Sequence, residues 1–184
     1  MPEVPILAED ARIAAARSHW QYRGQARPPF AEATEPGEES VWDFPRPPLI
    51  EDVREELRVE LRGELIAKSA RGKRVIETAG APTYYFPPED ILVPLEKGSG
   101  RSLCEWKGLA EPLDFTNFQG VAWRYVEMFP AFRDLYLWVA FYPTRLECYI
   151  GSERVTPQPG SYYGGWVTKD LKGPIKGEPG SGGW

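Results

Sequence analysis

One short segment, Cys104 to Gly108, carries the residues best suited to covalent chemistry. A cysteine attacks as its thiolate, and a nearby cation favours that anion. Lys107 follows Cys104 by three positions, which on a regular strand would place the two side chains on opposite faces. A turn or bulge at Gly108 would be needed to bring them together. The sequence therefore leaves two interpretations open, a reactive Cys104 or an inert buried thiol beside a solvated lysine.

Metal-dependent and histidine-dependent chemistry have less support. Cys104 and Cys148 are the only cysteines and form no CxxC pair, so the common four-ligand zinc layouts are absent. His19 is the only histidine, and it falls in a predicted helix, where a surface role is the simpler interpretation. The chain also has no acidic-x-acidic triplet of the kind that holds two Mg²⁺ ions in nucleotidyl transfer. We therefore expect no bound metal and no cofactor.

The basic cluster Lys68–Arg74 is the one group of like charges that suggests an anion site. It is not a phosphate-binding loop of the Walker type, because Ala67 stands where a glycine is required and Arg74 follows Lys73 in place of Ser or Thr. Arg71 or Arg74 could grip an anion. Alternatively, the cluster is a charged strand edge that prevents pairing with another chain.

Composition indicates a single soluble globular domain. The 184 residues are 42% hydrophobic and 27% charged, and 18 Gly with 19 Pro favour many turns and short strands over long helices. The net charge of −5 argues against a nucleic-acid partner. No stretch approaches the roughly 20 apolar residues that span a membrane, and the first ten residues lack the pattern of a signal peptide. We expect a cytoplasmic protein with no membrane partner, and composition leaves its oligomeric state open.

The predicted elements divide the domain, residues 1–184, into three parts. Residues 1–50 hold a helix over 9–19 and then a Pro-rich arm. Residues 51–150 form the β core. Residues 151–184 form an ordered Gly/Pro-rich tail, in which four aromatic rings suit docking onto the body better than flexibility.

Strand signals dominate the β core. Leu57, Val59 and Leu61 alternate with charged residues, which is the period of a half-buried strand. Further elements are strands over 65–67, 75–78, 83–86, 102–106, 121–126, 138–142 and 147–150, a hairpin over 149–155, and short helical turns over 87–91 and 129–135.

Six runs of sequence, in order along nearly the whole chain, resemble the domain of unknown function family 427, which is also described as nucleotidyltransferase-like. The resemblance implies a bacterial, mainly β protein with a β-tent fold: two antiparallel sheets that lean together over a pocket. The tail from residue 151 onward is similar to that of many members. The six runs are Glu39–Pro48, Ala70–Thr78, Thr83–Pro88, Cys104–Gly108, Ala122–Tyr125 and Val139–Pro143.

Methionine sulfoxide reductase B and the ligand-binding domain of cereblon share the β-tent architecture that the resemblance implies. Several such relatives hold a structural zinc between two cysteine pairs, which this sequence lacks, so a zinc-free tent is the consistent expectation. Sulfoxide reduction would need Cys148 to act as a resolving thiol for Cys104. Nothing in the sequence brings the two together.

Aromatic residues on the predicted strands suggest what the pocket contains. Trp123 and Tyr125 share one strand face by period two, and aromatic walls with a few polar groups make a small-molecule site. Packing in a core is the alternative role for the same rings. The family pattern also matches Arg74 with Glu77, which we expect to pair at or beneath the pocket floor. The candidate ligand-binding residues are Arg74, Glu77, Tyr84, Tyr85, Cys104, Trp106, Lys107, Trp123 and Tyr125.

Three classes of function are consistent with these residues. The first, which we favour, is a domain that binds a small ligand in an aromatic-lined pocket between the sheets. The second is an enzyme, either nucleotidyltransferase-like or dependent on Cys104. The third is a protein-interaction module that uses the Pro-rich arm, Pro45–Pro48, as a ligand or a clasp.

Overall fold

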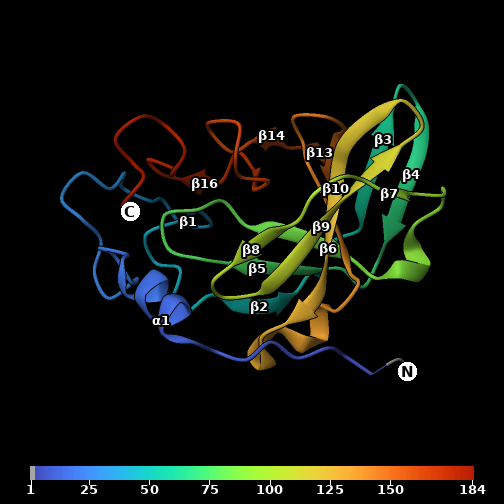
Figure 1. The fold of residues 1–184 in the computed structure, drawn as a ribbon. Helices are drawn as coiled ribbons and strands as arrows, with labels where there is room; N and C mark the ends of the chain where they lie inside the picture. The colour runs from blue at the N-terminus through green and yellow to red at the C-terminus, as the bar shows by residue number, and fades with distance from the viewer. Residues whose placement is uncertain (1–2) are drawn as a thin grey trace.

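The computed structural model describes residues 3–184 and shows a mainly β protein with one short α-helix (Figure 1). The helix, α1 (Ala11–Ser18), begins after Asp10, whose carboxylate accepts hydrogen bonds from two backbone N–H groups of the first turn at 2.9 and 3.0 Å. Such a cap satisfies donors that the first turn leaves free. The helix predicted over 9–19 is thus confirmed. No helix in the described part of the chain is long and apolar enough to cross a membrane.

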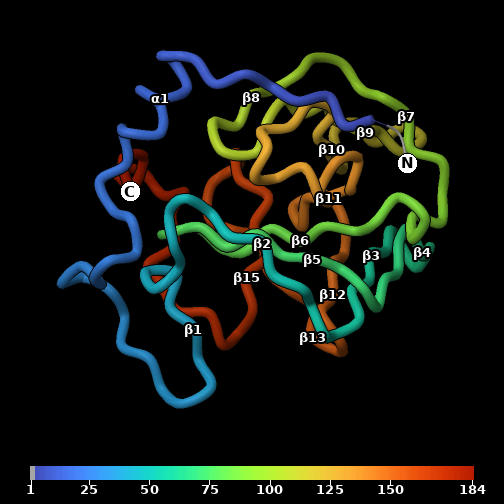
Figure 2. Tube along the Cα trace, turned by 90° about the horizontal axis from the view of Figure 1, so that it is seen from below, coloured from blue at the N-terminus to red at the C-terminus, as the bar shows by residue number. Residues whose placement is uncertain are grey.

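Eight strands form the larger sheet, in which every neighbouring pair is antiparallel. Its order is β2-β5-β6-β11-β10-β9-β7, and β8 also pairs with β9. Figure 2 shows β8, β9 and β10 on one side of β11, with β6, β5 and β2 on the other. The strands are β2 (Leu49–Asp52), β5 (Lys73–Ile76), β6 (Thr83–Phe86), β7 (Glu96–Lys97), β8 (Ser102–Cys104), β9 (Gly108–Phe115), β10 (Phe118–Met128) and β11 (Val139–Phe141).

Four strands form the smaller antiparallel sheet, in the order β13-β12-β3-β4. Leu57 and Val59 of β3 are fully buried while Arg58 between them is only half-buried, as the alternating pattern predicts. Gly151, at φ 56°, makes the tight turn between β12 and β13 where the hairpin was expected. The strands are β3 (Leu57–Leu61), β4 (Glu64–Ser69), β12 (Glu147–Ile150) and β13 (Glu153–Arg154).

One small parallel sheet and a backbone hydrogen bond from Trp166 to Pro82 tie the C-terminal tail to the body, and a second small sheet forms within the tail itself. Strand β16 pairs in parallel with β1 of the N-terminal arm, and β14 pairs with β15. Trp166 is fully buried, which confirms that the tail docks, whereas Tyr162 is 76% exposed and the docking predicted for it is wrong. The remaining elements are β1 (Glu39–Ser40), β14 (Thr156–Pro157), β15 (Trp166–Val167), β16 (Leu171–Lys172) and the 3₁₀ helices η1 (Pro88–Asp90) and η2 (Pro130–Leu135).

Strand β9 is the largest element that the sequence pattern does not predict. Proline is rare inside strands because it donates no hydrogen bond, and Pro112 lies in the middle of β9. Here Pro112 falls between the part of β9 that pairs with β8 and the part that pairs with β7, where the edge ladder is interrupted. The strand predicted over 102–106 ends early, at Cys104, because the next three residues form a turn into β9.

The two faces of the larger sheet have different surroundings. One face packs against the smaller sheet in a continuous apolar core that contains Tyr84, Phe86 and Phe141. Trp166 from the tail fills this core, stacks on Tyr84 with ring centres 4.9 Å apart, and donates from its Nε1 to the Phe141 carbonyl at 3.0 Å. The space between the two sheets is therefore closed, and the pocket expected there lies elsewhere.

The opposite face of the larger sheet carries a second apolar cluster that includes Val75, Tyr85, Ala110 and Tyr125. Tyr85 follows Tyr84 in β6 and so points to the other side of the sheet. Helix η2 covers one part of this face with the buried side chain of Phe132. The part that it leaves uncovered holds the pocket.

Candidate functional site

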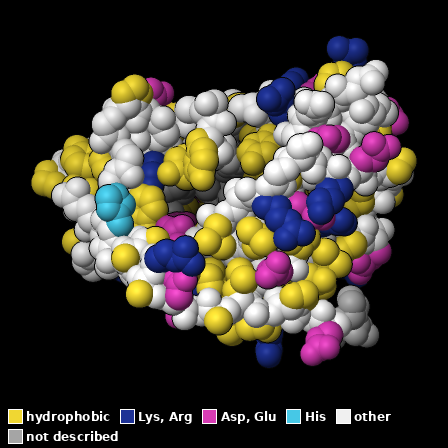
Figure 3. All heavy atoms as spheres, viewed as in Figure 1, with side chains coloured by type: hydrophobic (Ala, Val, Ile, Leu, Met, Phe, Trp, Pro, Cys, Tyr) yellow, Lys and Arg dark blue, Asp and Glu magenta, His cyan; other side chains and the backbone are white. Residues whose placement is uncertain are grey.

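A pocket of about 610 Å³ opens on this second face of the larger sheet. Figure 3 shows the molecule hollowed, with hydrophobic side chains around the opening. Strands β5, β6, β8, β9 and β10 form its floor and walls, and the N-terminal arm and the tail close it with Trp20, Arg46, Tyr163 and Lys176. The volume is typical of sites for small organic ligands.

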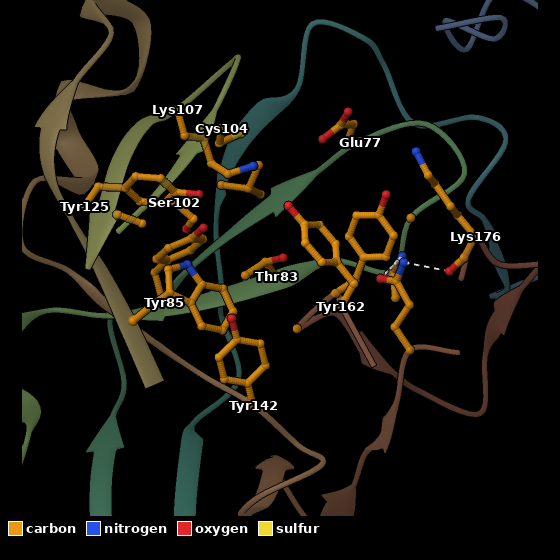
Figure 4. A pocket seen from close by; sticks show the side chains of 18 of the residues that line it. Glu77, Thr83, Tyr85, Ser102, Cys104, Lys107, Tyr125, Tyr142, Tyr162 and Lys176 are labelled. Atoms are coloured by element: carbon orange, nitrogen blue, oxygen red, sulfur yellow. Dashed lines mark hydrogen bonds between the residues drawn. The ribbon is translucent and has the colours of Figure 1, made fainter. Parts of the chain in front are cut away.

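A tight turn between β8 and β9 brings Lys107 back beside Cys104 (Figure 4). Gly108 completes the turn at φ 139°, and a Cβ on it would lie 2.1 Å from the carbonyl oxygen of Glu127, so only glycine fits there. The N-terminal arm holds the turn, because the Trp20 Nε1 donates to the Glu105 carboxylate at 2.7 Å. This is the geometry that the sequence required for the two side chains to meet.

The Lys107 ammonium has no carboxylate partner within 4.0 Å among residues 3–184. Burial disfavours its charge, but Cys104, Tyr85 and Glu77 outweigh burial, and the net effect raises the pKa of Lys107. Lys107 is therefore a cation at neutral pH that faces the pocket with its donors available.

Two phenols lie beside Lys107 at the same end of the pocket (Figure 4). Tyr85 is completely buried, and its hydroxyl has no hydrogen-bond partner within the described chain. Burial raises the pKa of Tyr85 to about 12 and that of Tyr125 well above its usual value, so both hydroxyls stay protonated at neutral pH. A buried polar group without a partner is rare and costly, so the Tyr85 hydroxyl marks a position where an acceptor would be stabilised.

Trp123 forms a flat, half-buried wall next to this polar end. Its ring centre lies 6.5 Å from that of Tyr85 and 4.4 Å from that of Tyr142. Gly164 of the tail packs directly on the indole, since a Cβ on it would lie 2.3 Å from the Trp123 ring. The tail therefore helps to fix the wall.

The other end of the pocket is built by segments far apart in the sequence. Arg46 donates from its Nε to Glu77 at 3.0 Å and is only 5% exposed. Lys176 is 4% exposed, and its Nζ lies 3.4 Å from the centre of the Trp20 ring. Figure 4 shows Glu77, Tyr162 and Lys176 together at this end, across the pocket from Lys107.

Comparison with protein families now adds to this geometry. The family model described as Domain of unknown function (DUF427) matches residues 49–152. This chain belongs to the DUF427 family. The matched region contains every strand of the pocket, whereas Arg46, Tyr163 and Lys176 lie outside it. The comparison with curated proteins finds no match.

The DUF427 fold brings together most of the residues predicted from the sequence. Those that line the pocket are Glu77, Tyr85, Cys104, Lys107, Trp123 and Tyr125. Trp106 is buried in the second cluster, and Tyr84 is in the core between the sheets. Arg74 also lies outside the pocket lining.

The predicted ion pair between Arg74 and Glu77 is wrong. Arg74 pairs instead with Glu39 and Glu51, each at 2.7 Å, while Glu77 accepts from Arg46. The physical reason is the strand period, because residues three apart in or next to β5 point to opposite sides. The rest of the basic cluster is also neutralised, with Lys68, Arg71 and Lys73 paired to Glu56, Asp90 and Asp52.

Two other sequence alternatives can be placed. Cys148 lies in the core between the sheets, and burial raises the pKa of its thiol, whereas Cys104 lies on the pocket face; both are free. The two thiols are thus on opposite sides of the larger sheet. The Pro-rich arm packs into the body through Arg46 and Pro48, both buried. Within residues 3–184, no three His, Cys, Asp or Glu side chains form a group that could hold a metal ion.

Several pocket residues have no signal in the sequence. Arg46 is hidden in a Pro-rich run, and Lys176 in a Gly/Pro-rich tail that shows no strand or helix period. Tyr142 stands at the end of a predicted strand and Tyr163 in the tail, and both are aromatic residues of the type expected to pack. The tail places Tyr163 and Lys176 at the site, the N-terminal arm places Arg46 there, and Tyr142 follows β11 directly.

Proposed function

We propose that this DUF427 protein binds a small planar ligand that carries a carboxylate, phosphate or carbonyl oxygen. The observation that carries the proposal is the pairing of an unpartnered buried hydroxyl, Tyr85, with the unpaired ammonium of Lys107 at the end of an aromatic pocket. Both groups are donors, and one oxygen atom with two lone pairs can accept from both. A charge-assisted hydrogen bond of this kind is stronger than a neutral one.

The charge of the pocket supports an anionic ligand. The whole chain carries a net charge of −5. The charged side chains around the pocket are instead mostly cationic. Their local field attracts an anion to the pocket more strongly than the rest of the surface does. The cationic ones are Arg46, Lys107, Arg145 and Lys176, and the anionic ones are Glu77 and Glu105.

The wall beside the polar end supports a planar ligand. Trp123 presents part of its ring to the pocket, and Tyr142 packs against that ring with an interplanar angle of 42°. A flat ring placed against Trp123 would gain apolar and stacking contact. Its anionic substituent would then reach Lys107 and Tyr85.

Thiol chemistry at Cys104 is a second candidate, favoured by one observation. The turn into β9 places the Lys107 ammonium beside the Cys104 side chain in the pocket. A cation beside a pocket thiol is the environment of many reactive cysteines. The burial of Cys148 alone would make Cys104 react with iodoacetamide at least about tenfold faster than Cys148, so this difference does not test activation. A reaction rate of Cys104 that falls in Lys107→Met would support activation by the ammonium.

A thermal-shift screen of planar carboxylates and nucleoside monophosphates, with their neutral amide or nucleoside analogues, tests the proposed function. We expect at least one anion to raise the melting temperature and its neutral analogue to do so much less. The same anion should bind Lys107→Met at least about tenfold more weakly, since a charged hydrogen bond is worth roughly 1.5–3 kcal/mol.

Lys97→Met is the matched control, because that exposed lysine lies outside the pocket lining. It should bind the anion like the wild type. The proposal is wrong if no anion of the panel stabilises the protein, or if Lys97→Met and Lys107→Met weaken binding equally.

A further inference from the structure

Tyr162 is the most exposed aromatic residue of the tail, and it lines the pocket. Its ring centre lies 5.0 Å from that of Tyr163 in an edge-on contact. Figure 4 shows Tyr162 across the pocket from Tyr85 and Tyr125, with Thr83 between the two sides. An aromatic ring stabilises a fold by being buried, so this one contributes little to folding. Its exposed surface is available to a ligand in the pocket.

Tyr162 belongs to a loop, residues 159–164, whose base is fixed. The backbone N–H of Gln158 donates to the Gly165 carbonyl at 3.0 Å and closes the loop. The Gln158 side chain holds the base to the body, since its Oε1 accepts from the Ala81 N–H at 3.1 Å. Its Nε2 donates to another main-chain carbonyl of the tail at 2.8 Å. The position of the loop base relative to the larger sheet is therefore set by hydrogen bonds.

The tip of this loop has no such support. Within residues 3–184, the backbone groups of residues 160–164 make no hydrogen bond to other backbone groups. Ser161 and Tyr162 are both exposed. Segments with few hydrogen bonds and little burial have low local stability. The tip can therefore change its position at little cost while the base stays in place.

The loop also touches the wall on which we expect the ligand to stack. Gly164 is buried, and a Cβ on it would lie 2.3 Å from the Trp123 ring. Tyr142 packs against the same ring, with centres 4.4 Å apart. Burial raises the pKa of Tyr142, and the nearby Tyr162 adds to that effect. These contacts place Tyr162 next to the aromatic wall of the pocket.

We propose that Tyr162 is a further binding residue, whose ring covers the face of an aromatic ligand that Trp123 leaves open. With its carboxylate at Lys107, the ligand has one face of its ring against Trp123, and closure of the loop tip brings Tyr162 onto the other face. Aromatic rings attract one another in stacked and edge-on arrangements beyond the effect of burial alone. This inference rests on the proposed function and narrows its ligand class from planar anions to aromatic anions.

Calorimetric titration with two carboxylates of similar size tests the inference on the full-length protein. The probes are naphthalene-2-carboxylate and its fully saturated counterpart, which has the same charge but no aromatic face. Tyr162→Leu keeps an apolar side chain and removes the ring, whereas Tyr162→Phe keeps the ring. We expect Tyr162→Leu to lower the preference for the aromatic probe, measured as the ratio of the two Kd values, by about 2–12-fold. Tyr162→Phe should keep the ratio of the wild type.

Tyr149→Leu is the matched control, because Tyr149 lies on β12 of the smaller sheet and outside the pocket lining. It should leave the ratio unchanged. The same ratio in Tyr162→Leu as in the wild type would overturn the inference. If both probes then still bind Lys107→Met more weakly than the wild type, the proposed function stands. Absence of binding by either probe would overturn both.

A measurement on the wild type does not depend on how any variant binds. Nuclear magnetic resonance spectra are recorded on protein labelled at its tyrosine rings, and the Tyr162 signal is assigned by its absence in Tyr162→Phe. Saturating naphthalene-2-carboxylate should move this signal upfield, because a ring stacked on Tyr162 shields its protons. The saturated probe should not. A Tyr162 signal that the aromatic probe leaves in place would also overturn the inference.

Discussion

Tyr84 and Tyr85 are consecutive residues of one strand, yet they lie in opposite environments. Tyr84 faces the smaller sheet and stacks on Trp166 in a closed core. Tyr85 is equally buried, but it faces the pocket and its hydroxyl has no partner. The comparison shows that burial alone does not distinguish a structural aromatic residue from a candidate binding residue. What distinguishes them is whether the neighbouring space is filled, since Tyr84 stacks on Trp166 while Tyr85 lines an open pocket.

The same contrast holds for two tryptophans. Trp166 is fully buried on the closed face and its indole N–H is paired, whereas Trp123 on the pocket face is half-buried. The closed face therefore contributes mainly to stability, and the pocket face retains surface that a ligand can cover.

Trp166→Ala should produce the largest loss of stability on the closed face. It removes a fully buried ring that joins the tail to both sheets and leaves the Phe141 carbonyl without its donor. We expect the free energy of unfolding to fall by about 3–5 kcal/mol, as for other large-to-small core changes. Urea denaturation followed by circular dichroism measures it. A loss below 1 kcal/mol would show that the tail adds little to the core.

Lys176 should make stability depend on pH in one direction. Burial and Arg46 lower its folded pKa to about 8, below the ordinary lysine value of 10.5. Below about pH 8 the folded protein carries the buried Lys176 charge, which destabilises it. Between about pH 8 and 10.5 Lys176 is neutral in the folded chain and still protonated in the unfolded chain. The stability contributed by Lys176 therefore rises with pH in this range. The stability of the wild type relative to Lys176→Met should therefore rise by about 1–3 kcal/mol between pH 7 and 10. A constant or falling difference would contradict the assigned environment.

Trp123→Ala should cost less stability than Trp166→Ala. One side of the Trp123 ring already faces the pocket, so its removal exposes less new apolar surface. We expect a loss of about 1–2 kcal/mol together with loss of the thermal shift caused by planar anions. Equal losses for the two tryptophan variants in urea denaturation would remove the distinction between the faces.

Much of the fold could be predicted from local sequence patterns. The strand 57–61 and the hairpin 149–155 follow from period-two alternation and a glycine turn, and η1 follows from its two prolines and acidic residues. Strand β9 could not be predicted because Pro112 interrupts its sequence pattern. The proline is tolerated because it lies between the residues of β9 that pair with β8 and those that pair with β7.

The site could be predicted only in part. Strand period placed Trp123 and Tyr125 on one face, whereas the Cys104–Gly108 spacing left open whether a turn would bring Lys107 to Cys104. The Arg74–Glu77 prediction failed because the strand period turns the two side chains to opposite sides, and their actual partners come from other segments of the chain. The position of the pocket failed for a similar reason, because it depends on which face of the larger sheet the smaller sheet covers.

Calorimetric titration of Tyr85→Phe and Tyr84→Phe with one planar anion, indole-3-carboxylate, tests the central claim most directly. Both variants remove a single hydroxyl from neighbouring buried tyrosines, so their effects on packing are matched. We predict that Tyr85→Phe raises the Kd about 2–12-fold, the effect of one lost hydrogen bond of about 0.5–1.5 kcal/mol, and that Tyr84→Phe leaves the Kd unchanged. Equal affinity of both variants and the wild type, or no binding by any of them, would contradict a ligand site on the pocket face.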